Sequence, residues 1–224
     1  MNRPLTLLLL AACAATLTGC PMAGTWKGSA PRSARLATPR ALTAEGDVHH
    51  AGAGLTFPPT AAGFTRSAQH QYDQDGHDLS VGYDLVAPNW RMFVTIYVYP
   101  GPEHTYIGAT DAALRATQAR YVSGEMARVQ AEILGTHTDA ALLRQGPSAL
   151  FPESPETGGV MAVFTDRMST VFGPQDTLSE AHLALWASQW FLKVRATYPP
   201  QMEQAARQHL QQLVRRLTAA PAST

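Results

Sequence analysis

The clearest pattern in the chain is a strict alternation of apolar and polar or small residues over 79–86. A period of two residues is typical of a strand with one buried face. A second, more polar strand is predicted over 64–72. Because Asp75 and Gly76 lie between the two segments, we predict that they form a hairpin turn. The pattern thus indicates an antiparallel pair.

A third strand is predicted over 92–99, where β-branched and aromatic residues occupy both faces, as is typical of a central strand. After a Pro-Gly-Pro break, apolar residues recur at helical spacing up to Ile133, and Gly135 is a stop signal. This spacing predicts a long amphipathic helix. Gly124 lies inside it and permits a bend, because glycine weakens a helix interior.

The last third of the chain predicts further strands and a final helix. A hairpin is expected around Asp166 and Arg167. The 180–198 segment fits either a helix or alternating strands. We favour two strands joined by a turn at 187–189, because charged residues there have the opposite parity to apolar ones. After two prolines, apolar residues over 202–217 fall on one face of a helix.

This order of elements predicts an α+β domain with a largely antiparallel sheet, and with the long middle helix and the C-terminal helix packed on one face. The order resembles that of the PsbP/Mog1-like sandwiches. The segments LSVGYDL and VTIYVYPG resemble those of uncharacterised proteobacterial envelope proteins. Neither resemblance implies a catalytic motif, because one fold supports many functions.

Composition and charge narrow the class of protein. The chain of 224 residues is 45% hydrophobic, which is sufficient for one globular core. Its 17 basic and 17 acidic residues cancel, so no net field favours nucleic acid as a partner. Cys13 and Cys20 are the only cysteines, which leaves the rest of the chain without a disulfide scaffold or a thiol nucleophile.

The N-terminus has the pattern of a secretory signal. Arg3 precedes an apolar run over 5–17, which is too short for a membrane-spanning helix. The sequence Leu17, Thr18, Gly19 and Cys20 resembles the lipobox of bacterial lipoproteins. The resemblance implies a signal peptide over 1–19, cleavage before Cys20, and a lipid (with palmitate among the acyl chains) on its sulfur and new amine.

The predicted domain organisation follows from this anchor. Several acyl chains make attachment to the membrane stable. Because Pro21 stands where an Asp retains many lipoproteins in the inner membrane, the resemblance implies the outer membrane, with the domain facing the periplasm. Residues 20–54 are rich in Ala, Gly, Pro, Ser and Thr and are predicted to be the lipidated Cys and a flexible tether. A single domain is expected over 55–220.

A search for catalytic and metal-binding motifs assigns no catalytic residue, cofactor or metal. No G-x-S-x-G, H-E-x-x-H or phosphate-binding glycine loop is found. The acidic segment 73–78 has Gly76 at the fourth position rather than at the sixth position that an EF-hand needs, and we interpret it as a turn. The adjacent His49 and His50 would need a third ligand from elsewhere to hold a metal.

The candidate binding site is a cationic and aromatic patch on one sheet face. Lys193 and Arg195 share a side of the predicted last strand with Phe191, and Tyr97 and Tyr99 join them if the two strands are neighbours. Such a patch suits an anionic ligand or a partner protein; an ordinary solvated sheet face is the other interpretation.

The sequence leads to two functional hypotheses. The first is a non-catalytic lipoprotein of the outer membrane that binds an envelope protein or a small molecule. The alternative is a tethered envelope hydrolase with an acid-base pair chosen from Asp84, His70 and His77, near the first hairpin.

Overall fold

The computed structural model describes residues 33–219, apart from 44, 103–109, 138, 152–158, 171–172 and 188. The signal peptide, Cys20 and the first part of the predicted tether lie outside the described residues. The elements, in chain order, are β1 (Arg35–Ala41), β2 (Val48–His50), η1 (Ala51–Ala53), β3 (Leu55–Phe57), β4 (Thr60–Ala61), β5 (Phe64–Asp73), β6 (Leu79–Ala87), β7 (Trp90–Pro100), α1 (Asp111–Thr136), β8 (Ala141–Pro147), β9 (Val160–Thr170), β10 (Gly173–Trp186), β11 (Trp190–Tyr198), η2 (Pro200–Met202) and α2 (Glu203–Thr218).

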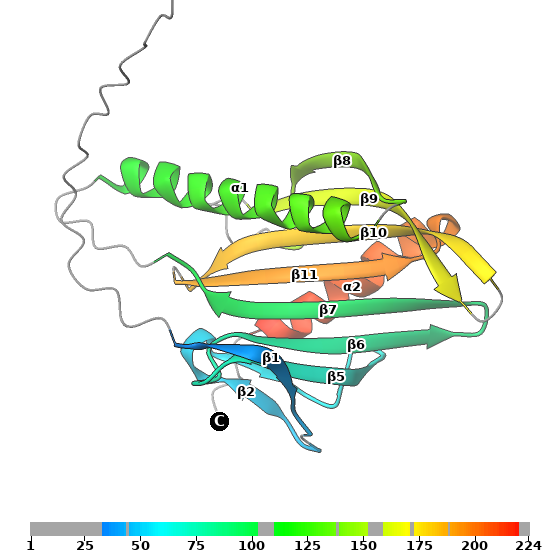
Figure 1. Ribbon diagram of the computed structural model, residues 1–224, viewed down its shortest axis with the longest axis horizontal. Coiled ribbons are helices and arrows are strands. Elements are labelled where there is room, and N and C mark those ends of the chain that lie inside the picture. Colours follow the sequence, from blue (N-terminus) through cyan, green and yellow to red (C-terminus); the bar gives the residue numbers. More distant parts are fainter. Residues whose placement is uncertain are drawn as a thin grey trace, which may run out of the picture. The chain divides into compact units, whose positions relative to one another are not determined.

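One nine-stranded antiparallel sheet dominates the fold (Figure 1). Its order is β1-β5-β6-β7-β11-β10-β9-β8, and β4 pairs with β5. β7 and β11 are neighbours at the centre, with Lys193 opposite Tyr97. A separate hairpin is formed by β2 and β3.

The prediction that both helices pack on one face is wrong, because α1 and α2 lie on opposite faces of the sheet (Figure 1). Apolar residues of α1, among them Val122 and Met126, pack against Leu183 and Phe164. Apolar residues of α2, among them Leu210, pack into a second cluster that contains Leu192. The structure is therefore a mostly antiparallel sheet with one helix on each side.

The strand β10 explains why a helix packs on each face of the sheet. Over β10, residues 177–185 are all buried, so apolar side chains of both parities are withdrawn from water. Leu183 and Leu185 belong to the cluster under α1, whereas Leu178 and Ala184 belong to the cluster on the α2 side. A single covering layer would leave half of these side chains exposed, which costs free energy in proportion to apolar area.

Most of the predicted elements are present. β5, β6 and β7 occupy the predicted ranges, and Gly76 in the first turn has a φ of 75°, a backbone conformation that glycine adopts without strain. The two strands predicted over 180–198 are confirmed as β10 and β11. The α1 helix passes through Gly124 as one element.

The hairpin predicted around Asp166 and Arg167 is wrong, because β9 continues through both residues. Both residues pair with β10, opposite Thr177 and Asp176. The Arg167 Nε atom also lies 3.1 Å from Asp176 Oδ1. Two consecutive polar residues within a strand thus have the composition that is typical of a turn.

Part of the predicted tether is folded. β1 lies within the predicted tether and pairs with β5. In the β2–β3 hairpin, β2 lies before the boundary predicted near residue 54 and β3 lies after it. Leu55 and Phe57 are core residues, and His50 is also buried. The folded unit therefore begins earlier in the chain than the composition indicates. Neither helix of the described residues is long and apolar enough to cross a membrane.

Candidate functional site

The α1 helix covers only part of its face of the sheet. Its apolar residues pack over β9 and β10, while the same face of β6 and β7 continues beyond the helix (Figure 1). We call this continuation the open face; it comprises Val86, Phe93, Thr95, Tyr97, Tyr99 and Arg195. None of these six side chains is buried. The other face of the same strands is closed by core residues such as Val94 and Ile96.

Cross-strand pairing sets the open face in rows. One row runs from Ser80 on β6 through Tyr97 on β7 to Lys193 on β11. The next row contains Thr95 opposite Arg195. Residues of one row point to the same side of a sheet, so an aromatic ring, a hydroxyl and two cations are neighbours here.

Lys193 stands at the boundary between the covered and open parts of the face. Its side chain is 7% exposed, and Nζ lies 4.1 Å from the centroid of the Tyr97 ring and 5.8 Å from that of Tyr99. A cation over an aromatic face is attracted by the ring. Burial nevertheless lowers the pKa of Lys193, because it removes water from the ammonium.

The hydroxyl of Tyr99 connects the open face to α1. It donates a hydrogen bond of 2.6 Å to Glu125 Oε1, and Arg128 also donates to this carboxylate. Burial raises the pKa of Tyr99, and the bond to Glu125 raises it further. Burial alone would raise the pKa of Glu125, but the hydrogen bonds from Arg128 and Tyr99 outweigh it and lower that pKa. This triplet fixes the Tyr99 ring beside Lys193.

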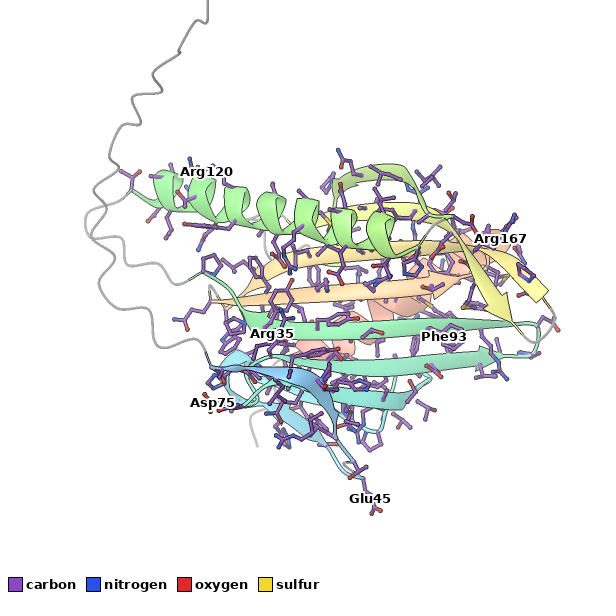
Figure 2. All side chains as sticks on the ribbon, viewed as in Figure 1. Arg35, Glu45, Asp75, Phe93, Arg120 and Arg167 are labelled. Carbon is purple, nitrogen blue, oxygen red and sulfur yellow. The ribbon has the colours of Figure 1, made fainter. Side chains whose placement is uncertain are left out.

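Exposed apolar side chains extend the open face at its other end. Val86 is 65% exposed and Phe93 is 36% exposed. Phe93 projects near one end of β7 (Figure 2). In the register, Val86 pairs with Arg91, and Phe93 lies two residues further along β7 on the same face. Aromatic, aliphatic and cationic groups share this surface with the carboxylate of Asp84, which lies opposite Phe93, and such a mixture is found at protein interfaces.

The structure brings together all five residues of the candidate patch. Phe191 and Tyr99 have ring centroids 5.4 Å apart, and Lys193 contacts both tyrosines. Only Tyr97, Tyr99 and Arg195 are partly accessible, because Phe191 and Lys193 are 7% exposed each. Sequence parity located this face. It gave no signal for Glu125 and Arg128, because both lie on α1 and Glu125 is 26 residues from Tyr99 in the chain.

The acid-base residues considered for a hydrolase do not form a cluster. His70 pairs across the strands with Ser80, four residues from Asp84, a distance of about 13 Å along a strand. Asp84 accepts a hydrogen bond from Ser67 Oγ at 2.8 Å. His77 lies in the turn, where its ring packs against Trp190 and its backbone N–H donates to Asp73.

A different serine, histidine and acid meet inside the molecule. Ser148 Oγ is 2.8 Å from His182 Nδ1, and His182 Nε2 is 3.5 Å from Glu180 Oε2. All three residues are buried, and Ser148 Oγ also accepts a hydrogen bond from the Leu150 N–H. The cluster therefore holds the segment after β8 against β10. Sequence spacing could not find it, because Ser148 and His182 are 34 residues apart.

The hollows formed by described residues are not lined by side chains of the open face. Hollows of about 460 and 490 Å³ lie elsewhere, one between α1 and β8–β9 and one beside Asp139 and Asp176. Among the described residues, no three His, Cys, Asp or Glu side chains are grouped as metal ligands would be. The arrangement suits recognition of a partner by contact area and charge.

Comparison of the chain with protein-family models, with curated proteins and with solved structures finds no match.

Proposed function

We propose that this chain is a lipid-anchored protein of the bacterial outer membrane, and that its domain faces the periplasm and binds an envelope protein or small molecule through the open face. The lipobox-like Leu17, Thr18, Gly19 and Cys20 support the anchor. The binding role is supported by a single observation: α1 leaves Phe93, Tyr97 and Tyr99 accessible beside Arg195 on a fully paired sheet. Binding here needs no rearrangement of the backbone.

The open face has three properties that favour binding. Tyrosine and phenylalanine bury a large area on contact and lose few rotamers. Arg195 adds a permanent positive charge, which selects an anionic group on the partner. The strands beneath are held by pairing on both sides, so the surface is preorganised and little ordering cost opposes association.

Photo-crosslinking in intact cells tests this proposal. A benzoylphenylalanine at Phe93 keeps an aromatic side chain in place and reports what touches the open face. The matched control is the same group at Gln208, an exposed residue of α2 on the opposite side of the sheet. We expect a discrete crosslinked adduct from position Phe93 and none from position Gln208. The double variant Tyr97→Ala with Arg195→Ala should reduce the yield of the Phe93 adduct at least tenfold. Identical adducts at both positions would refute the proposal.

A tethered envelope hydrolase is the second candidate, and the Ser148–His182 contact is the observation that favours it. In this reaction class His182 would accept the proton of the Ser148 hydroxyl, and Glu180 would orient the imidazole. A fluorophosphonate probe on the intact protein distinguishes the candidates. Labelling that Ser148→Ala abolishes would establish the hydrolase; an unlabelled, folded protein would exclude it.

A further inference from the structure

Lysine is rare in this chain. Only Lys27 and Lys193 are lysines among the 17 basic residues, and Lys193 is the one lysine among the residues that the structure describes. Every other cation in that part of the chain, including Arg195 on the same strand, is arginine. Arginine stays protonated in proteins, whereas a buried lysine can lose its proton. The difference between these two side chains is therefore chemical as well as geometric.

Among the lysines and arginines of the described residues, only arginines pair with carboxylates. Arg128 pairs with Glu125 at 2.5 Å, and Arg207 pairs with Glu203 at 2.8 Å. By contrast, no carboxylate of the described residues lies within 4.0 Å of Lys193 Nζ. The polar contacts of Lys193 are the two tyrosine faces. Lys193 is therefore not held by an ion pair within this part of the chain, and its amine lies against aromatic faces instead.

The surroundings of Lys193 lower the pKa of its amine below the ordinary lysine value. Lys193 as a whole residue is 7% exposed, and burial is the largest effect that lowers its pKa. Arg195 and Arg128 also lower this pKa, whereas Glu132 and Glu125 on α1 raise it. The Tyr97 face attracts the ammonium and opposes the burial effect. Desolvation and neighbouring cations are the two devices that activate a lysine nucleophile.

We propose that Lys193 is a nucleophilic amine that captures a ligand carrying an aldehyde or ketone group as an imine. The inference rests on the proposed binding function of the open face, because the amine lies at the edge of that surface. Tyr97 and Tyr99 provide apolar walls on which the rest of the carbonyl compound can lie. Arg195, opposite Thr95 in the next row, is placed for an anionic group on the same ligand.

The chemical step is balanced without an oxidant or reductant. The lone pair of the neutral amine attacks the carbonyl carbon, and a C–N bond forms while the carbonyl oxygen takes a proton. The second amine proton leaves with this oxygen as water, and the C=N bond of the imine remains. Hydrolysis by water reverses the step. The ligand is thus held covalently but reversibly.

Reductive alkylation of the intact, folded protein tests the inference. The protein is treated with propionaldehyde and cyanoborohydride at pH 7, and mass spectrometry locates and times the modification. An unstructured peptide with one lysine and a blocked α-amine is the reference. Because a lowered pKa leaves a larger fraction of the amine neutral at pH 7, we expect Lys193 to react faster than the reference. A rate at or below that of the peptide would overturn the proposal. This holds whether the amine reacts slowly because it is inaccessible or because it stays protonated.

Two variants separate this chemistry from a structural role. Arg195→Gln removes a neighbouring cation, so the pH midpoint of labelling at Lys193 should rise while the protein stays folded. An unchanged midpoint would contradict the assigned environment. Lys193→Arg keeps the charge but cannot form an imine. If the open face binds as proposed and only the amine chemistry is mistaken, this variant and the wild type will both give the Phe93 adduct, and neither will capture aldehyde.

Discussion

The indole N–H of Trp186 donates a hydrogen bond of 2.9 Å to the carbonyl oxygen of Ala53, which lies 133 residues earlier in the chain. This contact joins η1 to the end of β10. Trp190, across the turn, packs its ring against His50 with centroids 4.5 Å apart. The two tryptophans therefore attach the N-terminal hairpin to the centre of the sheet.

Gly52 should be intolerant of a side chain at this junction. A Cβ there would lie 2.3 Å from Cζ2 of Trp190, whose ring is held between His50 and His77 and cannot move freely. We expect Gly52→Ala to lower the free energy of unfolding by about 1–3 kcal/mol, as overpacking does. Urea denaturation measures the loss.

The matched control for Gly52 is Gly46→Ala, because no atom lies within 4 Å of a Cβ at Gly46. This exposed substitution should change stability by less than about 0.5 kcal/mol. Equal effects of the two alanines would show that the hairpin does not rest on Trp190.

His50 should make the stability of this junction depend on pH. The Ala53 N–H donates to Nδ1, so this nitrogen carries no proton and Nε2–H donates to the His77 carbonyl. Burial lowers the pKa of His50. The unfolded chain therefore binds the proton more readily, and stability that is complete above about pH 6.5 is lost as the pH falls toward the folded pKa.

The test compares melting temperatures at pH 7.5 and 5.5. His50→Asn keeps an acceptor for the Ala53 N–H but does not titrate, so its melting temperature should fall less on acidification than that of the wild type. His49→Asn, at an exposed neighbour bonded to Thr56, should retain the wild-type dependence. A wild-type response in His50→Asn would assign the pH dependence to another group.

Local patterns predicted strands and helices better than they predicted how these pack. The alternation of apolar residues predicted β6, and the positions of the charged residues predicted β11. The structure confirms both strands. The side on which a helix packs depends on distant residues. Leu183 and Ala184 both need cover, on opposite faces of β10, and a periodicity analysis that seeks one buried face cannot show this.

Composition misplaced the start of the fold for a related reason. Residues 48–54 consist of Val, His, Ala and Gly and lie in the predicted tether, yet His50 and Ala53 are buried and β2 pairs with the β3 strand of the core residues Leu55 and Phe57. Their burial depends on α2 and on the tryptophans of β10 and β11. A short apolar segment becomes part of a core only when its partners are known.

The candidate site shows the same division. The shared face of Lys193 and Arg195 followed from their spacing, and their pairing with β7 is seen in the register. The burial of Lys193 did not follow, because it depends on α1, which reaches this row through Glu125. Exposure is thus the property of the site that sequence alone could not predict.

Glu180 should be a major determinant of stability. It is fully buried, with Oε2 3.6 Å from Arg207 Nε and 3.5 Å from His182 Nε2. Arg207 is partly exposed and keeps its pair with Glu203, but loss of Glu180 leaves the buried His182 Nε2 without its partner, which costs about 1–3 kcal/mol. We expect a loss of this size for Glu180→Ala in urea denaturation. Glu45→Ala, an exposed control, should be nearly neutral.

Glu180 should also make stability depend on pH, but for a different reason from His50: charged neighbours lower the pKa of Glu180, whereas burial lowers that of His50. Burial raises the pKa of Glu180, but His182 and Arg207 outweigh burial and hold it below 4.5. Its stabilising contribution is therefore present above about pH 4.5 and is lost as the pH falls through the folded pKa. In Glu180→Gln this part of the acid sensitivity should be missing; if the acid limb is unchanged, other carboxylates cause it.

Cys20 is the residue on which the proposed anchor depends. No other cysteine follows the apolar run, so Cys20→Ala removes the only thiol that could receive a diacylglyceryl group at the predicted cleavage site. Metabolic labelling with a palmitate analogue should mark the wild type and leave the variant unlabelled, because the variant has no thiol at the predicted site to receive the lipid. Cys13→Ala, within the apolar run, is the matched control and should be labelled normally. Equal labelling of all three proteins would refute the lipoprotein assignment while leaving the open face and its amine to be judged by their own experiments.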